Sequence, residues 1–205
     1  MDVVEKTVKT EEFATVADFK HIFTEDVSRL YLLSLLLTGD CDKAEECLVA
    51  AVEECTAKTR VFRGWAHSWA HRAIVQSAIR AIAPRERVAL ASSKSDIKRA
   101  IENVPFLLHD EVCAILQLTP LERFVFVMSV LERYPDYDCA ILLGCSRRDI
   151  PTIRAQAMQQ LGILLDRQDV SQTAAQRATL AESGTIIDLL IAQHFAVPLQ
   201  GRSLA

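Results

Sequence analysis

The stretch that decides the fold lies in the second half of the chain and reads Ala140-Ile141-Leu142-Leu143-Gly144-Cys145-Ser146-Arg147-Arg148-Asp149-Ile150-Pro151-Thr152-Ile153-Arg154. Its alanine, glycine and two isoleucines have the spacing of two helices joined by a tight turn. A small residue at 140 lets the helices cross closely, glycine at 144 permits a positive φ in the turn, and the isoleucines anchor the second helix. The pattern predicts a helix-turn-helix; the alternative is an ordinary corner in a helical bundle.

The start of the second helix in this stretch is polar and basic. Ser146 and Asp149 predict a cap for its first turn, because a serine or aspartate oxygen accepts from otherwise unpaired backbone N–H groups. In a DNA-reading helix-turn-helix, this turn touches base edges and phosphates. The candidate DNA-contacting residues here are Ser146, Arg147, Arg148, Thr152 and Arg154.

Upstream of this stretch lies the clearest helix start in the chain. Thr119, Pro120 and Glu122 combine a cap residue, a proline in the first turn and an acid at the third position. Apolar residues then recur at helical spacing as far as Leu131, and Tyr134-Pro135-Asp136 predicts the end of this helix.

Three further helices are predicted in the first half of the chain. Apolar residues at spacings of three and four predict the first over residues 19–37, and Gly39 ends it. Asp42 with Glu45 predicts the cap of the second. The third is predicted over residues 62–82, with an apolar side and a polar stripe in which every fourth residue shares a face: Ser68, Arg72, Gln76 and Arg80.

The fold class predicted for the chain is all-α, with two small helical domains joined by a linker and the helix-turn-helix in the second. Helical periodicity is lost between the two halves, where proline, charged residues and paired serines predict a tether. The predicted divisions are a frayed N-terminus, a first domain, the linker, a second domain and a C-terminal helical extension: 1–14, 15–82, 83–100, 101–165 and 166–205.

Composition agrees with a helical fold and reveals a segregation of charge. Half of the 205 residues are apolar, while glycine and proline number only 6 each, which disfavours disorder and a β-sandwich. The net charge of -4 conceals a basic middle block, because residues 60–100 carry 9 basic and 2 acidic side chains. Residues 1–59 carry 6 basic and 13 acidic ones. Such a pattern indicates an anionic partner at the middle and another partner at the acidic N-terminal part, although a solvated basic linker is an equal alternative.

Other classes of protein receive little support. The longest apolar run is too short for a membrane span, and the first residues lack the order of an export signal, so we expect a cytoplasmic protein without membrane contact. The six cysteines form no CxxC pair, and we expect no disulfide framework. We expect no metal site; the alternative, which the sequence supports only weakly, is a zinc site formed by His67, His71 and nearby cysteines. No catalytic motif is present, so we expect neither an enzyme nor a cofactor.

Three motifs together resemble the extracytoplasmic-function (ECF) type of bacterial RNA polymerase sigma factor, over most of residues 15–165. Residues 37–46, Leu-Thr-Gly-Asp-Cys-Asp-Lys-Ala-Glu-Glu, are similar to the turn into the family's polymerase-binding helix. Residues 62–80, Phe-Arg-Gly-Trp-Ala to Arg80, are similar to its helix that opens the minus-ten promoter element. Residues 118–123, Leu-Thr-Pro-Leu-Glu-Arg, with Tyr134, Ala140, Gly144 and Ser146, are similar to its fourth region, which binds the minus-thirty-five element.

The resemblance implies partners and roles. Core RNA polymerase would be bound through its β flap and its β′ clamp helices, the latter by Asp42, Glu45, Glu46 and Leu48. Promoter DNA is the second partner, and an anti-sigma factor is a further one that the family allows. The residues implied around the melted strand are Arg63, Trp65, Arg72, Gln76 and Arg80. Trp69 is a base-stacking residue or, as we favour, a core residue.

Departures from the family pattern motivate a second hypothesis. In the second helix of the pair, the places where the family carries Lys and Arg hold Pro151, Ile153, Gln156, Met158 and Gln160. Each lost phosphate contact lowers the affinity for DNA and its salt dependence. Pro151 is expected to distort the first turns of this helix. The alternative function is a sigma-like adaptor that acts through protein contacts with little promoter binding.

The C-terminal part contains one further amphipathic segment, Thr185-Ile186-Ile187-Asp188-Leu189-Leu190-Ile191-Ala192. We expect it to pack back on the second domain, with masking of the DNA-facing helix or a groove for a partner as the alternatives.

Overall fold

The structure of the protein is a computed structural model that describes residues 13–57, 60–85, 94–102, 104 and 108–171. The described residues are all-helical, and their only β pairing is an isolated bridge between Phe13 and Phe62. The fold class is therefore all-α, as predicted. The expected frayed residues 1–12, linker residues 86–93 and extension residues 172–205 lie outside the described part.

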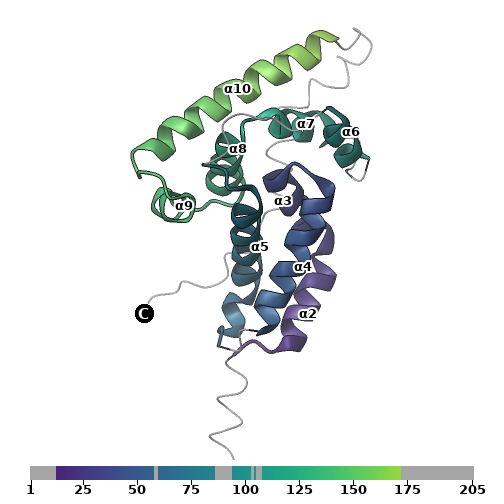
Figure 1. Cartoon of the computed structure of the whole chain (residues 1–205), viewed down its shortest axis with the longest axis vertical. Coiled ribbons are helices and arrows are strands. Elements are labelled where there is room, and N and C mark those ends of the chain that lie inside the picture. Colours follow the sequence, from purple (N-terminus) through teal and green to yellow (C-terminus); the bar gives the residue numbers. More distant parts are fainter. Residues whose placement is uncertain (1–12, 58–59, 86–93, 103, 105–107, 172–205) are drawn as a thin grey trace, which may run out of the picture.

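The first half is built around one buried helix. Its helices are α2 (Val16–Glu25), α3 (Val27–Thr38), α4 (Cys41–Ala57), the short 3-10 helix η1 (Arg63–Trp65) and α5 (Ala66–Ile82). The single helix predicted over residues 19–37 is two, because the chain breaks at Asp26, whose ψ of 15° is not helical. Eight of the twelve residues of α3 are buried, and the helix contacts α4 and α5 as well as helices of the second half of the chain (Figure 1).

Two local signals decide where α3 ends and α4 begins. Gly39 takes a φ of 69°, the left-handed conformation that ends a helix at little cost for glycine. The predicted cap at Asp42 is wrong: Asp40 accepts a hydrogen bond from the Lys43 backbone N–H at 3.0 Å, and Asp42 lies inside the first turn. Asp40 lies three residues before Lys43, and Asp42 lies three residues before Glu45, so both have the spacing of a cap. The turn at Gly39 places Asp40, the earlier of the two, at the start of α4.

The second half contains α6 (Lys94–Ile101), α7 (His109–Gln117), α8 (Pro120–Phe126), a π-helical turn η3 (Val127–Leu131), α9 (Asp136–Leu143) and α10 (Asp149–Ser171). The predicted cap of α8 is confirmed, since Glu122 accepts from both the backbone N–H and the hydroxyl of Thr119. Residues 94–100, placed in the linker from sequence, are helical. Helix α10 runs past residue 165 and crosses above α7 and α8 in Figure 1.

A buried arginine joins the two halves. Arg123 of α8 is 2% exposed, and its guanidinium donates to Leu37 O at 3.3 Å, Thr38 O at 3.1 Å and Leu116 O at 3.2 Å. These carbonyls lie at the C-terminal ends of α3 and α7, where the last carbonyls of a helix lack partners within it and the helix dipole is negative. Arg123 therefore stabilises two helix ends from different halves of the chain.

A second buried contact links α5 to the end of η3. His71 Nδ1 lies 2.7 Å from Glu132 Oε2, and both side chains are less than a tenth exposed. Helix α5 also contacts α9. The halves thus pack through polar groups as well as through the apolar core.

Candidate nucleic-acid and protein interfaces

Helices α9 and α10 meet through a five-residue connection, residues 144–148. Gly144 ends α9 with a φ of 65°, and Cys145 N–H donates back to Ala140 O at 3.0 Å. Ala140 and Ile150 are buried where the two helices approach the core, and Ile153 is half-buried. The residues singled out by their spacing therefore occupy the turn and the contacts between these helices.

The connection that leads into α10 is capped and presents two cations. Ser146 N–H donates to Asp149 Oδ2 at 3.3 Å, while Ser146 Oγ accepts from Arg148 N–H at 3.2 Å, so the predicted cap is present. Arg147 and Arg148 are exposed. Within the described residues neither guanidinium forms an ion pair. Two cations are therefore available to an anionic ligand at the start of α10.

The two other residues of α10 predicted to contact DNA differ in how available they are to a ligand. Thr152 is exposed, but the Arg154 guanidinium lies 2.6 Å from Asp136 Oδ1 of α9. Pro151 is the third residue of α10, within the first turn, where a backbone N–H has no partner inside the helix. A proline at this position therefore removes no hydrogen bond within the helix.

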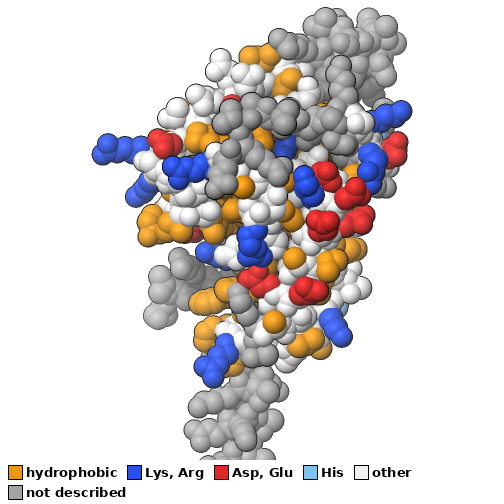
Figure 2. Space-filling model, viewed as in Figure 1, with side chains coloured by type: hydrophobic (Ala, Val, Ile, Leu, Met, Phe, Trp, Pro, Cys, Tyr) orange, Lys and Arg blue, Asp and Glu red, His pale blue; other side chains and the backbone are white. Residues whose placement is uncertain are grey.

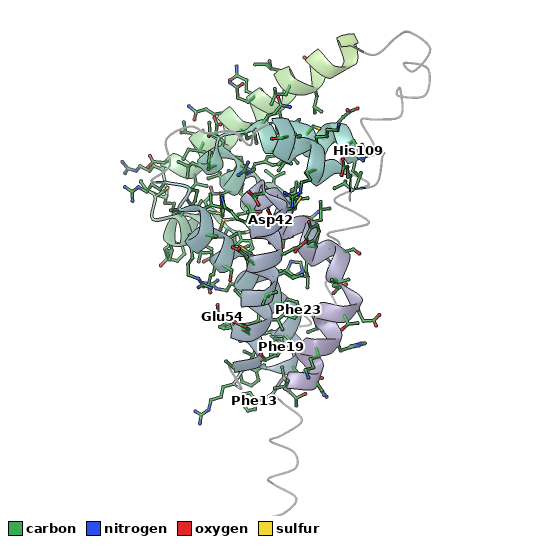
Figure 3. The ribbon with its side chains drawn as sticks, turned by 45° about the vertical axis from the view of Figure 1, so that its right-hand side comes forward. Phe13, Phe19, Phe23, Asp42, Glu54 and His109 are labelled. Atoms are coloured by element: carbon green, nitrogen blue, oxygen red, sulfur yellow. The ribbon has the colours of Figure 1, made fainter. Side chains whose placement is uncertain are left out.

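An aromatic cluster lies at the N-terminal end of α5. Phe13 and Phe62 stack with ring centroids 4.9 Å apart, and Trp65 meets Phe62 edge-on at 5.4 Å. Trp65 is 66% exposed. Figure 3 labels Phe13 at the end of the molecule opposite α10. The exposed ring of Trp65 suits stacking with an unpaired base.

Arg63 lies beside this cluster but is held by an acid of its own chain. Its Nε and Nη2 donate to Asp18 Oδ1 at 3.2 and 2.8 Å. Hydrogen bonds from the backbone and side chain of Thr15, and then from Arg63, lower the pKa of Asp18 to about 2. Asp18 also completes the capping box of α2, so this ion pair fixes Arg63 to the start of that helix.

The polar stripe predicted on α5 is only partly accessible. Arg72 and Gln76 are half-buried, and Arg80 is exposed but donates to Glu54 at 3.1 Å and to Ser77 at 2.9 Å. Trp69 is half-buried and packs against the core, the position that we favoured from sequence. Of the five residues predicted around a DNA strand, Trp65 is the most accessible and unrestrained.

The acidic face expected to bind polymerase lies on α4. Asp42, Glu45 and Glu46 are exposed and Leu48 is half-buried. Arg99 of α6 donates to Asp42 Oδ1 at 2.6 Å, so one of the three acids is engaged within the chain. Figure 2 shows acidic and basic side chains gathered together on one side of the molecule. Glu45 and Glu46 remain as acids for a basic partner.

The alternatives of metal binding and membrane insertion find no support in the described ranges. No group of three metal-ligating side chains occurs there. His67 Nδ1 lies 3.3 Å from Asp26, and His71 is occupied by Glu132. None of the helices described is both long and apolar enough to cross a bilayer.

Compared with models of protein families, with curated proteins and with solved structures, the chain matches none. Its function must therefore be inferred from residues and geometry.

Three features of the structure could not be predicted from the sequence patterns. The roles of Phe13 and Phe62 in the aromatic cluster depend on contact between segments about fifty residues apart. Arg123 and the His71–Glu132 pair also depend on distant partners. The one available signal was Arg123 itself, a charged residue on the buried side of a strongly apolar helix.

Proposed function

We propose that the chain is a sigma factor of the ECF type, a cytoplasmic protein that binds core RNA polymerase and directs it to promoter DNA, without chemistry of its own. The observation that carries the proposal is the pair of exposed cations, Arg147 and Arg148, in the capped connection immediately before α10. In this proposal α9 and α10 act as the helix-turn-helix, and the start of α10 enters the major groove.

Two other surfaces support the same function. The exposed ring of Trp65, backed by Phe62 and Phe13, offers stacking to a base of the melted strand. Glu45 and Glu46 on α4 offer charge complementarity to basic clamp helices of polymerase. An acidic face and an aromatic face on one small helical unit are what binding to polymerase and promoter strand requires.

The test removes both cations of α10 at once. The probe is duplex DNA enriched from a random-sequence library by wild-type protein bound to core RNA polymerase, and binding of the polymerase complex is measured in a gel-shift titration. Arg147→Ala plus Arg148→Ala should weaken binding at least about 10-fold and lower the slope of log K against log salt by about 2, since each phosphate contact contributes about 0.9.

A matched control removes the same charge elsewhere. Lys20 of α2 and Lys98 of α6 are exposed and lie outside α9 and α10, so Lys20→Ala plus Lys98→Ala should leave the affinity near that of the wild type. Equal losses in the two double variants, or no loss in either, would contradict a DNA contact at the start of α10.

A second candidate function is the sigma-like adaptor, and the packing of the two halves favours it. Buried contacts of Arg123 and of the His71–Glu132 pair hold the second half of the chain against the first. A rigid arrangement of this kind favours an adaptor, because a protein that acts through protein contacts does not have to follow two separate promoter elements.

In vitro transcription separates the two candidates. Purified core polymerase, the chain and a library of promoter-bearing templates are mixed, and transcripts and polymerase binding are both measured. A sigma factor yields transcripts that depend on the chain. Polymerase binding without any transcript, with promoter affinity unaffected by Arg147→Ala plus Arg148→Ala, would support the adaptor.

A further inference from the structure

A largely apolar cavity lies where the two halves of the chain meet. Its volume is about 290 Å³, and it is lined by side chains of α3, α7, α8, η3 and α10, among them Leu36, Ile115, Phe126 and Leu161. At ~30 Å³ for a water-sized group, this volume holds roughly ten non-hydrogen atoms, the equivalent of two or three leucine or isoleucine side chains.

One charged side chain lines this cavity. Glu111 of α7 has its Oε2 atom buried without a hydrogen-bond partner among the described residues. Burial raises the pKa of Glu111, because the charged form loses its hydration. A buried carboxyl oxygen without a partner is costly, so this part of the cavity favours an occupant that carries a hydrogen-bond donor.

The side of the cavity formed by α10 is open to an incoming segment. Met158 is 55% exposed although it lines the cavity, and Gly162 supplies no side chain one turn further along. A Cβ atom built at Gly162 would meet no atom within 4 Å, so space is left over this part of α10.

The chain itself contains a segment with matching chemistry, residues 185–194, which lies outside the described residues. At helical spacing, Ile187, Leu190 and Ile191 share one face, and His194 follows on that same face. An imidazole within an apolar face is the complement of a carboxyl within an apolar cavity.

The connection is long enough for this segment to return to the cavity. Helix α10 ends at Ser171, six residues beyond Leu165, the last of its residues that line the cavity. Those six residues carry the chain about 9 Å away at ~1.5 Å each, whereas residues 172–184 can span up to roughly 43 Å when extended. Reach therefore does not limit docking.

We propose that residues 185–194 dock in the cavity between α3, α7 and α10, with Ile187, Leu190 and Ile191 filling it and His194 against Glu111. The docked segment contacts both halves of the chain and holds them together. This inference is independent of the function proposed above, because it involves only contacts within the chain.

The test measures hydrogen exchange of the backbone amides in residues 185–194 of the full-length protein, by mass spectrometry. In the wild type these amides should exchange at least about 10-fold more slowly than in a synthetic peptide of the same sequence. Gly162→Trp, which fills the open side of the cavity, should bring exchange to the rate of the peptide. Gln160→Trp, on the opposite face of α10 and exposed, is the matched control and should retain the protection.

A second variant removes any dependence on the folding of Gly162→Trp. Leu190→Asp alters only the proposed docking segment, and it should abolish the slow exchange while that of α3 and α8 stays at the wild-type rate. Wild-type amides that exchange as fast as the peptide would overturn the proposal, as would protection that survives both Gly162→Trp and Leu190→Asp. Protection that disappears on dilution, together with a dimeric mass in light scattering, would overturn it in favour of a second copy.

Discussion

Replacing Arg123 with methionine is the sharpest test of how the two halves are held together. Methionine keeps much of the apolar stem and removes the guanidinium, which donates to Leu37 O, Thr38 O and Leu116 O. The variant therefore leaves carbonyl groups at the ends of α3 and α7 without their cationic partner. Neither end can be solvated readily, because the site is buried.

The expected magnitude follows from the acceptors that lose their donor. A buried acceptor left without a partner costs about 1–3 kcal/mol, so three carbonyls set a range of roughly 3–9 kcal/mol. Burial lowers the pKa of Arg123 from 12.5 to about 10, because the charged form loses its hydration, and removal of the buried cation therefore offsets part of this loss. We therefore expect Arg123→Met to lower the free energy of unfolding by about 3 kcal/mol, the lower end of that range.

Urea unfolding followed by far-UV circular dichroism measures this difference. Arg147→Met is the matched control, because its guanidinium is exposed and forms no ion pair with described residues, and it should lie within about 0.5 kcal/mol of the wild type. A value for Arg123→Met within about 0.5 kcal/mol of the wild type, or above it, would refute the view that this cation stabilises the two helix ends.

Two further predictions concern local structure. Asp18→Ala should destabilise the protein by about 1 kcal/mol at neutral pH, as loss of a capping interaction does. Because the folded pKa of Asp18 is about 2, below its ordinary value of 3.8, this contribution is complete above about pH 5 and is lost as the pH falls through 2. Thermal melts of wild type and variant should therefore converge in acid, and a constant gap would contradict the assignment. Gly144→Ala should lower the free energy of unfolding in urea by about 1–2 kcal/mol, because alanine is strained at a φ of 65°. Gly64→Ala is the control and should lower it less, because Gly64 has a negative φ. Equal losses in the two variants would show that the turn at Gly144 is relaxed in solution.

Much of the local structure could be predicted from residues close together in the chain. The capping box at Thr119, the end of α3 at Gly39 and the turn at Gly144 each depend on backbone groups within a few residues. The break at Asp26 could not be predicted in this way, since the apolar spacing continues across it. The choice of Asp40 over Asp42 as a cap was also missed, because either carboxylate could accept a hydrogen bond from the backbone of the first turn.

In the candidate site, too, some features could be predicted from neighbouring residues and others depend on distant partners. Exposure of Arg147 and Arg148 follows from their position between a turn and the first turn of a helix, and their availability to a ligand was foreseeable. The ion pairs that engage Arg63, Arg80 and Arg154 were not, because their partners come from other helices. Whether a cation is free to bind a ligand thus depends on acids that packing places beside it rather than on its own sequence neighbours.

The sequence by itself determined that this protein is helical, where several of its helices are capped, and which residues lie at the turn between α9 and α10. Those properties depend on hydrogen bonds and apolar spacing within one or two helical turns. Only the tertiary structure placed Arg123 against carbonyls 85 and 86 residues away, paired His71 with Glu132, and formed the cavity beneath α10. Such contacts arise when distant segments are buried together, and a buried charge must then find whatever acceptors the packing brings near it.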